Sequence, residues 1–291
     1  MDKVGPMKQA SLKGSRYTIL CKDEASNYRL VKFVETKDMI PDEVKQIISK
    51  AIIESGRKVR QIVTDNGTEF VNDNLRRFLR EDGIQHIVSV PYTPQQNGFI
   101  ERDIRTIFEA ARVILNKSEL SKELWAEAVN TSVYTMNRSV NSSNQVKTPF
   151  ELWFGMKPSV KNLRIFGQQA VVLYKSNQRS KWDDKGTLQT FVGYTERFNT
   201  YRFYDAMTHS VYESCDAIFL SDNGAPMVTS SIGGTIEITA ETEGQIGEPD
   251  DDDTIIDESS TEIQVPCQDT FDRPSADIQE HTPQPRQETE P

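Results

Sequence analysis

The chain has 291 residues, of which 36% are hydrophobic and 27% charged, so it is long enough to bury at least one core. Its net charge of −10 is unevenly distributed: residues 222–291 carry 18 Asp and Glu against two Arg, which leaves residues 1–221 with a net charge of +6. The overall acidity therefore does not exclude nucleic acid as a partner of the basic part. No stretch approaches the roughly 18 apolar residues of a membrane span, and the few Cys and His residues give no zinc cluster of neighbouring ligands.

Strands and helices are predicted to alternate in the first third of the chain. Short runs rich in β-branched and aromatic residues indicate strands at 17–22, 28–34, 60–65 and 86–90. The first two flank a polar turn, which is typical of a hairpin. Apolar residues at helical spacing predict a helix over 42–55, and Asn72 is expected to cap a second helix that ends near Gly83. This alternation favours an α/β layered fold.

Two long amphipathic helices are predicted next, the first over about residues 99–117 and the second from Ser121. The segment 91–98, which contains Pro and Gly, is expected to be the loop that leads into the first of them. Beyond Pro158 the hydrophobic period changes to two, which predicts a small β-barrel or sandwich. Its strands are expected at 170–174, 188–194, 200–205, 210–213 and 217–220. The acidic tail, residues 222–291, has little to bury and is predicted to be disordered.

Two acidic residues stand where a strand ends and where a long helix begins. Asp65 follows the apolar residues of the strand predicted at 60–65, and Glu101 lies in the first turn of the helix predicted at 99–117, with 35 residues between them. If that helix packs across the sheet, the two carboxylates converge. In proteins, Mg²⁺ is usually bound by one or two carboxylates. Water and substrate phosphate complete its octahedral coordination.

Four strings of sequence carry a resemblance to a known family. They are VTDNGTEF (63–70), PYTPQQNGFIER (91–102), LWAEAVNTSVYTMNR (124–138) and TPFELWFGMKPSVKNLRIFG (148–167). In this order they resemble the integrase segment of copia-type retrotransposon polyproteins, and the likeness runs from Asp2 to about Leu220. The resemblance implies an α/β fold: a ribonuclease-H-like core, a mixed sheet flanked by helices, followed by a small all-β SH3-like domain and the disordered acidic tail.

The resemblance also implies a division of the chain into four parts. The expected parts are an integrase catalytic core at 1–140, a linker with a short helix at 141–160, the SH3-like domain at 161–221 and the tail at 222–291. Because the family acts on DNA, the expected location is intracellular, and nuclear at the time of action.

The family's catalytic triad of two Asp and one Glu matches Asp2, Asp65 and Glu101 position by position. The resemblance implies that these carboxylates hold two Mg²⁺ or Mn²⁺ ions, for which we expect Asp2 to be shared and the other two to serve one ion each. Two-metal chemistry suits in-line displacement at a phosphodiester. The implied activity is DNA integration, in which water trims the 3′ end of the element and the exposed hydroxyl then attacks target DNA. The implied partners are element ends, target DNA and further copies of the chain, with no membrane and no nucleotide cofactor.

Four residues are candidates for contact with DNA. On a helix, Arg105 lies 40° and Arg112 20° from Glu101, so the three share one stripe, and such arginines could hold the phosphate backbone. The alternative is a solvated face with a Glu101–Arg105 pair worth about 0.3–0.5 kcal/mol. For Gln95 and Asn97 the resemblance implies a loop that positions DNA ends, and the alternative is an ordinary connection between a strand and a helix.

Two departures from the family pattern keep a second function open. Asp2 directly follows Met1, so the strand that carries the first carboxylate is expected to be truncated, and Ile104 stands where the family usually has Asn. A loosely held metal ligand loses positional accuracy, and about 1 Å of misplacement can cost about 10²-fold in rate. The alternative to an active integrase is therefore a catalytically inactive or domesticated remnant that binds nucleic acid.

Overall fold

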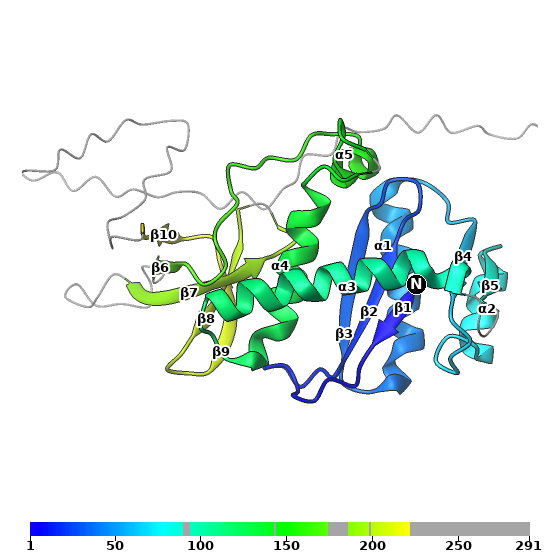
Figure 1. The fold of residues 1–291 in the computed structure, drawn as a ribbon, viewed down its shortest axis with the longest axis horizontal. Helices are drawn as coiled ribbons and strands as arrows, with labels where there is room; N and C mark the ends of the chain where they lie inside the picture. The colour runs from blue at the N-terminus through cyan, green and yellow to red at the C-terminus, as the bar shows by residue number, and fades with distance from the viewer. Residues whose placement is uncertain (90–93, 143, 174–185, 198, 222–291) are drawn as a thin grey trace, which may run out of the picture.

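The structure is a computed structural model that describes residues 1–89, 94–142, 144–173, 186–197 and 199–221 (Figure 1). The predicted disordered tail at 222–291 lies outside these residues. The strands of the first part are β1 (Asp2–Val4), β2 (Tyr17–Lys22), β3 (Arg29–Val34), β4 (Gln61–Thr64) and β5 (Gln85–Val88). Its helices are α1 (Ile40–Ser55), α2 (Asp73–Glu81), α3 (Pro94–Lys117), α4 (Trp125–Asn137) and the short α5 (Pro149–Phe154).

The first five strands make a mixed arrangement. β1, β2 and β3 pair antiparallel in that order, and the register places Asp2 opposite Leu20, while β4 and β5 pair in parallel. The Met1 amino group donates a hydrogen bond to the Val63 carbonyl at 2.6 Å, which sets the start of β1 beside β4. The strands therefore follow one another in the spatial order β3, β2, β1, β4, β5.

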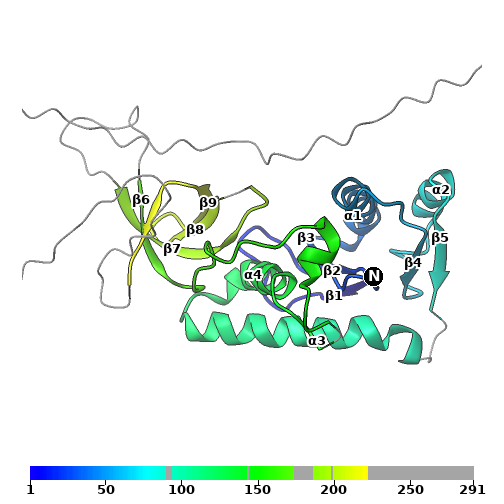
Figure 2. The same cartoon turned by 90° about the horizontal axis from the view of Figure 1, so that it is seen from above.

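Helices cover both faces of these strands (Figure 2). Because successive strand residues point to opposite faces, Ile19 and Leu20 of β2 enter different cores. Ile19 lies in the cluster formed with α1 and α2, which includes Val44, Ile48 and Leu75. Leu20 lies in the cluster formed with α3 and α4, which includes Ile107, Leu124, Val129 and Val133. This three-layer arrangement confirms the predicted α/β class.

The start of α3 differs from the sequence prediction. The helix begins at Pro94, so Gln95, Asn97 and Gly98 lie in its first turns and not in a loop. Proline is favoured at the first position of a helix, where its missing N–H costs nothing, and the interior Gly98 is outweighed by the helix that follows. The backbone of Gln95 and Asn97 is described, whereas their side chains lie outside the described part of the chain.

The second part is a five-stranded antiparallel sheet in the order β10, β6, β7, β8, β9. The strands are β6 (Gln169–Leu173), β7 (Gly186–Tyr194), β8 (Tyr201–Asp205), β9 (Ser210–Ser214) and β10 (Ala217–Phe219), close to the positions predicted. An aromatic core fills its inner face, with Phe191 and Phe203 fully buried between Tyr194, Tyr201 and Phe219.

Helix α4 packs against this sheet along β7. The hydroxyl of Thr131 donates to the Val192 carbonyl at 3.1 Å, and the ring of Tyr134 stacks on that of Tyr194 with centroids 3.9 Å apart. Gly193 permits this approach, since a Cβ there would lie 3.0 Å from the Thr131 hydroxyl. The two parts are therefore joined by packed and hydrogen-bonded side chains.

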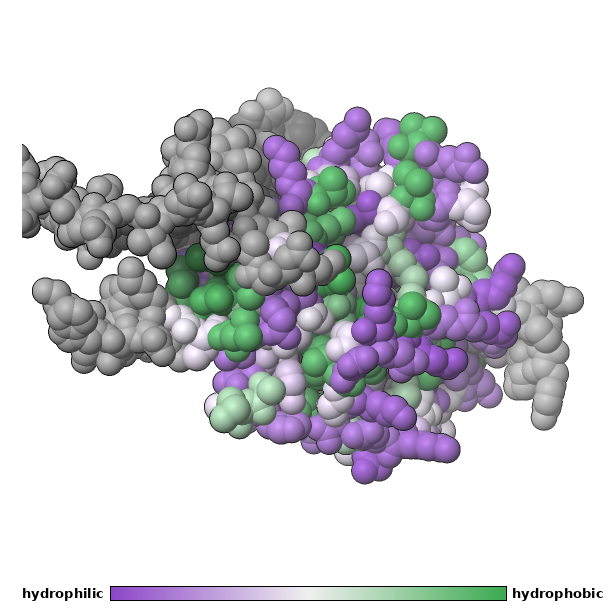
Figure 3. Space-filling view, turned by 60° about the vertical axis from the view of Figure 1, so that its left-hand side comes forward, coloured by the Kyte–Doolittle hydropathy of each residue, from purple (hydrophilic) through white to green (hydrophobic). Residues whose placement is uncertain are grey.

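Hydrophilic and apolar side chains alternate over the face shown in Figure 3, with several apolar groups beside the residues drawn in grey. On the outer side of the second sheet, Leu188 of β7 is 61% and Ile218 of β10 42% exposed, and each of them is paired with Val171 of β6.

Among the helices described, none has the length and apolar character that crossing a lipid bilayer requires.

Helix α2 offers a direct test of the predicted cap. The Asn72 side chain accepts a hydrogen bond from the Leu75 backbone N–H at 2.9 Å, as its position before the helix predicts. We expect Asn72→Ala to lower the free energy of unfolding by about 1 kcal/mol, because one N–H of the first turn loses its partner. Urea denaturation measures the change. Asn116→Ala, at an exposed site in α3, is the control and should change stability by less than about 0.5 kcal/mol; equal losses would contradict the capping role.

Candidate active site

The three predicted carboxylates come from three separate elements. Asp2 opens β1 and is half-buried, Asp65 directly follows β4 and is half-buried, and Glu101 is exposed in the second turn of α3. The Met1–Val63 hydrogen bond brings the start of β1 to the end of β4, and α3 contacts both β1 and β2. The topology therefore carries the strand-borne pair and the helix-borne carboxylate toward one edge of the sheet.

The pKa of Asp2 responds to the charges of the other two carboxylates. Burial raises the pKa of the Asp2 carboxyl above its ordinary value, and a hydrogen bond from the Lys3 backbone N–H at 2.7 Å opposes this. The negative charges of Asp65 and Glu101 raise this pKa further, whereas the Met1 ammonium lowers it. Repulsion between carboxylates is the signature of a site that gathers negative charge.

The donor set suits a hard divalent cation. It consists of carboxylate oxygens alone, which Mg²⁺ and Mn²⁺ prefer, and a cation would relieve the repulsion that raises the Asp2 pKa. Within the described ranges, however, no three His, Cys, Asp or Glu side chains are already arranged as a ligand set. The chemistry of the residues fits the ion, and the predicted roles of Asp2, Asp65 and Glu101 stay predictions.

The loop after Asp65 is held to β1 by a buried ion pair. Lys3, next to Asp2, pairs with Glu69, a buried carboxylate four residues after Asp65. The Gly67 N–H donates to the Asp65 side chain at 3.3 Å, and a Cβ at Gly67 would meet the Glu69 carboxylate at 2.6 Å. A side chain at 67 would therefore require the Glu69 carboxylate to shift, and the Lys3–Glu69 ion pair ties the loop after Asp65 to the strand that carries Asp2.

His86 also lies near the end of β4. Its Nε2 is 2.9 Å from the hydroxyl oxygen of Thr64, and burial together with the charge of Arg76 lowers the pKa of the imidazole. The side chain is half-buried between strands. It supports the end of β4 through Thr64, which precedes Asp65.

The exposed stripe of α3 carries the predicted arginines. Arg105 and Arg112 are exposed on the helix that bears Glu101, and neither makes an ion pair with any residue the structure describes. The Glu101–Arg105 ion pair of the predicted alternative is not formed, whereas the exposure of the stripe agrees with the solvated face that this alternative expects. Ile104, by contrast, packs into the core between α3, α4 and the sheet. Both guanidinium groups are exposed on the helix that bears Glu101, Arg105 about one turn and Arg112 about three turns after it.

One buried acidic residue near the site was missed by sequence reasoning. Asp103, two residues after Glu101, is 7% exposed and pairs with Lys22 and Arg29 at the closed end of the β2–β3 hairpin. Its neighbours in sequence, Glu101 and Arg102, are exposed, so the run of charges looked like a solvated face. No local signal distinguishes Asp103, because both of its partners lie more than 70 residues away.

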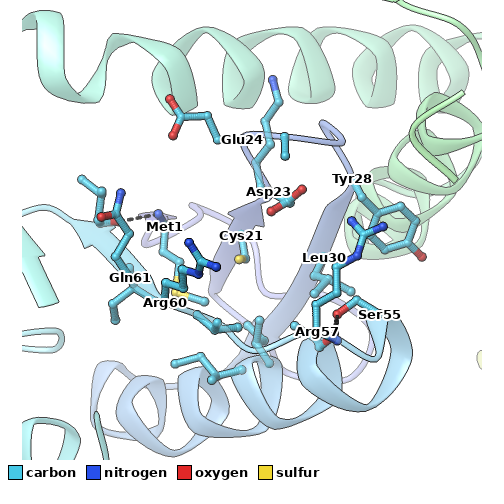
Figure 4. Close-up of a pocket in the computed structure, with 18 of the residues that line it drawn as sticks. Met1, Cys21, Asp23, Glu24, Tyr28, Leu30, Ser55, Arg57, Arg60 and Gln61 are labelled. Atoms are coloured by element: carbon cyan, nitrogen blue, oxygen red, sulfur yellow. Dashed lines mark hydrogen bonds between the residues drawn. The ribbon is translucent and has the colours of Figure 1, made fainter. Parts of the chain in front are cut away.

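A cavity of about 440 Å³ lies beside the site, between β2, β4, α1 and the start of α3 (Figure 4). Its floor is apolar, with Leu30, Ile47 and Ile62, and the thiol of Cys21 lines it. Basic and acidic side chains stand at its edge, among them Arg57, Arg60, Asp23 and Glu24. Met1 also lines the cavity, and Asp2 is the next residue in the sequence.

Comparison with protein families gives two matches. Residues 1–94 match the model of the integrase core domain, which contains Asp2 and Asp65, and residues 168–232 match the model of the retroviral polymerase SH3-like domain. The second match covers the β6–β10 sheet.

Curated relatives share the same region of sequence. The chain is 34% identical to the retrovirus-related Pol polyprotein from transposon TNT 1-94 of Nicotiana tabacum. The aligned region has 218 residues and covers 75% of this chain. The chain is 30% identical over 225 residues to the Pol polyprotein from transposon RE2 of Arabidopsis thaliana, which covers 77% of this chain. The chain spans only 16% and 15% of the length of these relatives.

Among solved structures, the catalytic core domain of BIV integrase is similar at a TM-score of 0.38, with 17% identity over 48% of this chain and 86% of that one. A simian T-cell lymphotropic virus intasome chain is similar at a TM-score of 0.40, with 16% identity over 68% of this chain and 69% of that one.

Proposed function

We propose that this chain, which belongs to the integrases of copia-like transposon Pol polyproteins, carries out DNA integration by trimming 3′ ends and joining them to target DNA. The observation that carries the proposal is the convergence of charge on Asp2. The carboxylates at the end of β4 and on α3 both raise the pKa of Asp2 in β1, and Asp2 and Asp65 lie within the segment that matches the integrase core domain. The integrase core family is generally dependent on divalent metal ions, and the all-carboxylate donor set agrees with this.

Asp2, Asp65 and Glu101 would hold two Mg²⁺ or Mn²⁺ ions in this proposal. When bound, the ions supply charge stabilisation for the attacking and leaving oxygens of a phosphodiester displacement. The chain's own part is to hold the carboxylates in place. The Lys3–Glu69 pair and the Met1–Val63 hydrogen bond tie the Asp65 loop to β1, and helix packing places Glu101. The DNA would be element ends and target duplex, the acting species an assembly of several copies, and the place of action the nucleus.

The exposed arginines of α3 supply the proposed contact with the DNA backbone. We expect the double change Arg105→Gln/Arg112→Gln to weaken binding of duplex oligonucleotides almost equally for all sequences. The slope of log affinity against log salt should fall by up to about 1.8, because each lost phosphate contact accounts for about 0.9. Fluorescence anisotropy over a range of salt concentrations measures this.

A matched pair of changes controls for the loss of positive charge. Arg77 and Arg80 are exposed on α2, which lies on the opposite side of the sheet from α3 (Figure 2). Arg77→Gln/Arg80→Gln should leave the salt slope within about 0.3 of the unchanged protein. If both double variants lower the slope alike, the contact is diffuse attraction to the basic part of the chain, and the stripe has no special role.

The direct test of the proposed function is a strand-transfer assay on the full chain. A labelled oligonucleotide with a recessed 3′ end should be joined to plasmid DNA in the presence of Mg²⁺ or Mn²⁺ and not in EDTA. Asp65→Asn should abolish the product while leaving DNA binding intact. The alternative is a catalytically inactive or domesticated remnant that binds nucleic acid without catalysis. Binding without any metal-dependent product would establish that alternative.

A further inference from the structure

The inner face of α3 carries a buried cluster of charges directly behind Glu101. Asp103 lies two residues further along the helix, hence 200° around it, and is 7% exposed while Glu101 is exposed. The side chains of Lys22 and Arg29 are also buried, at 7% and 9% exposure. Two cations and one carboxylate thus share an interior position.

Both oxygens of Asp103 are engaged. Oδ2 accepts from Nε of Arg29 at 2.7 Å, and Oδ1 accepts from Nη2 of Arg29 at 2.7 Å and from Nζ of Lys22 at 3.0 Å. The contact with Arg29 is therefore bidentate, the geometry that fixes both distance and orientation. Lys22 and Arg29 are cross-strand partners at the end of the β2–β3 hairpin, so Asp103 binds both strands at once.

The cluster reaches two further places. Nζ of Lys22 lies 3.8 Å from the ring centroid of Phe99, in the turn of α3 that precedes Glu101. The side chain of Asn137 at the end of α4 accepts from the Arg29 N–H at 3.0 Å and donates to the Arg29 carbonyl at 2.8 Å. Through these contacts β2, β3, α3 and α4 meet around one carboxylate.

Apolar packing sets which face of α3 is buried, but it is less directional than a hydrogen-bonded ion pair. Ile100, Ile107 and Ala111 press α3 against the sheet, but burial of apolar surface is non-directional. Buried ion pairs contribute little net stability compared with apolar residues, and they are best attested as devices that set register. A directional contact two residues from Glu101 is therefore suited to set the position of that carboxylate.

We propose that Asp103 is a positioning residue, a buried anchor that fixes the first half of α3 against the β2–β3 hairpin and thereby places Glu101 next to Asp2 and Asp65. The anchor is a property of the fold, whereas its consequence for metal binding rests on the proposed function. Nothing in the family matches assigns a role to Asp103, Lys22 or Arg29.

The test uses a variant that keeps the buried charge constant. Asp103→Asn alone leaves two unpaired cations inside the protein and can unfold it. In Asp103→Asn/Lys22→Met, the cluster loses its carboxylate and one cation, so its net charge stays at +1. The matched control is Asp42→Asn/Lys45→Met, the same two chemical changes at an exposed ion pair of α1. All are made in the full chain.

Two readouts separate the anchor from its consequence. Hydrogen exchange measured by mass spectrometry should show faster exchange in residues 98–107 of the Asp103→Asn/Lys22→Met protein, with β7 and β8 unchanged, and no change in the control. Mn²⁺ affinity, measured by electron paramagnetic resonance of the free ion, should fall by about 10- to 100-fold, the usual loss when a group that orients a metal ligand is removed.

The outcomes are distinct. Unchanged exchange in residues 98–107 overturns the anchor, whether or not metal binds. Faster exchange with unchanged Mn²⁺ affinity overturns the link from Asp103 to Glu101. Faster exchange in a protein that binds no Mn²⁺ even when unmutated supports the anchor and counts against the proposed function alone.

Discussion

Glu101→Gln is expected to lower the rate of strand transfer by about 10³-fold, while the protein folds and binds DNA as before. Glutamine keeps the shape of the side chain and loses the charge, so under the proposed function a divalent ion that supplies several kcal/mol of stabilisation would lose a ligand. Glu101 is exposed, which predicts a change in unfolding free energy below about 0.5 kcal/mol. A gel assay of labelled oligonucleotide product in saturating Mg²⁺, together with urea denaturation, measures both quantities.

Glu109→Gln is the matched control for this change. Glu109 is exposed on the same helix about two turns further along, so its loss alters the charge of α3 equally without touching the carboxylate site. The control should keep strand transfer within about threefold of the unchanged protein. Equal rates for Glu101→Gln and the unchanged protein would leave the family membership standing and remove Glu101 from the catalytic set.

Glu127→Ala is expected to lower the free energy of unfolding by about 3 kcal/mol. Glu127 of α4 accepts from Nε and Nη2 of Arg202 at 2.7 and 2.6 Å, a bidentate pair in which the side chains are 12% and 14% exposed. Removing the carboxylate leaves a largely buried guanidinium with reduced compensation, and broken buried pairs cost about 3–5 kcal/mol. We place the effect at the lower end because Arg202 keeps a second partner. Urea denaturation followed by tryptophan fluorescence measures the loss.

That second partner provides the control. Glu213 accepts from Nη1 of Arg202 at 2.9 Å, but its side chain is 45% exposed. Glu213→Ala should cost at most about 1 kcal/mol, because solvent screens the pair. Similar losses for the two variants would show that the contact between α4 and the β6–β10 sheet is loose, contrary to the packing of Tyr134 on Tyr194.

Local features of the fold were predictable from sequence. The hairpin of β2 and β3 follows from β-branched runs about a polar turn, and the cap at Asn72 follows from its side-chain oxygen before an apolar helix. The start of α3 was not predicted correctly. A segment with Pro94 and Gly98 was interpreted as a loop, although proline at the first turn is compatible with a helix and one glycine costs only about 1 kcal/mol.

Some residues of the candidate site were likewise predictable from sequence, and others were not. Asp65 and Glu101 were identified from their placement and spacing, and Asp2 came from the family resemblance. Asp103 could not be identified, since its meaning depends on Lys22 and Arg29, which are 81 and 74 residues away in sequence. Lys3 and Glu69 raise the same difficulty. Contacts of this kind are set by tertiary packing, and no periodicity in a single sequence records them.

The length of α3 has a mechanical consequence. The helix has 24 residues, about 36 Å at the usual rise, and runs without a break from the carboxylates to the foot of the β6–β10 sheet (Figure 1). Next to this end of α3, Ser118 lies so close to Gly167 that a Cβ added at Gly167 would be 2.5 Å from the Cβ of Ser118. α3 is one continuous helix, so a tilt of about 5° about Glu101 would displace Lys117, about 24 Å away, by about 2 Å. A change in the position of Glu101 would therefore be transmitted along α3 to the contact between Ser118 and Gly167.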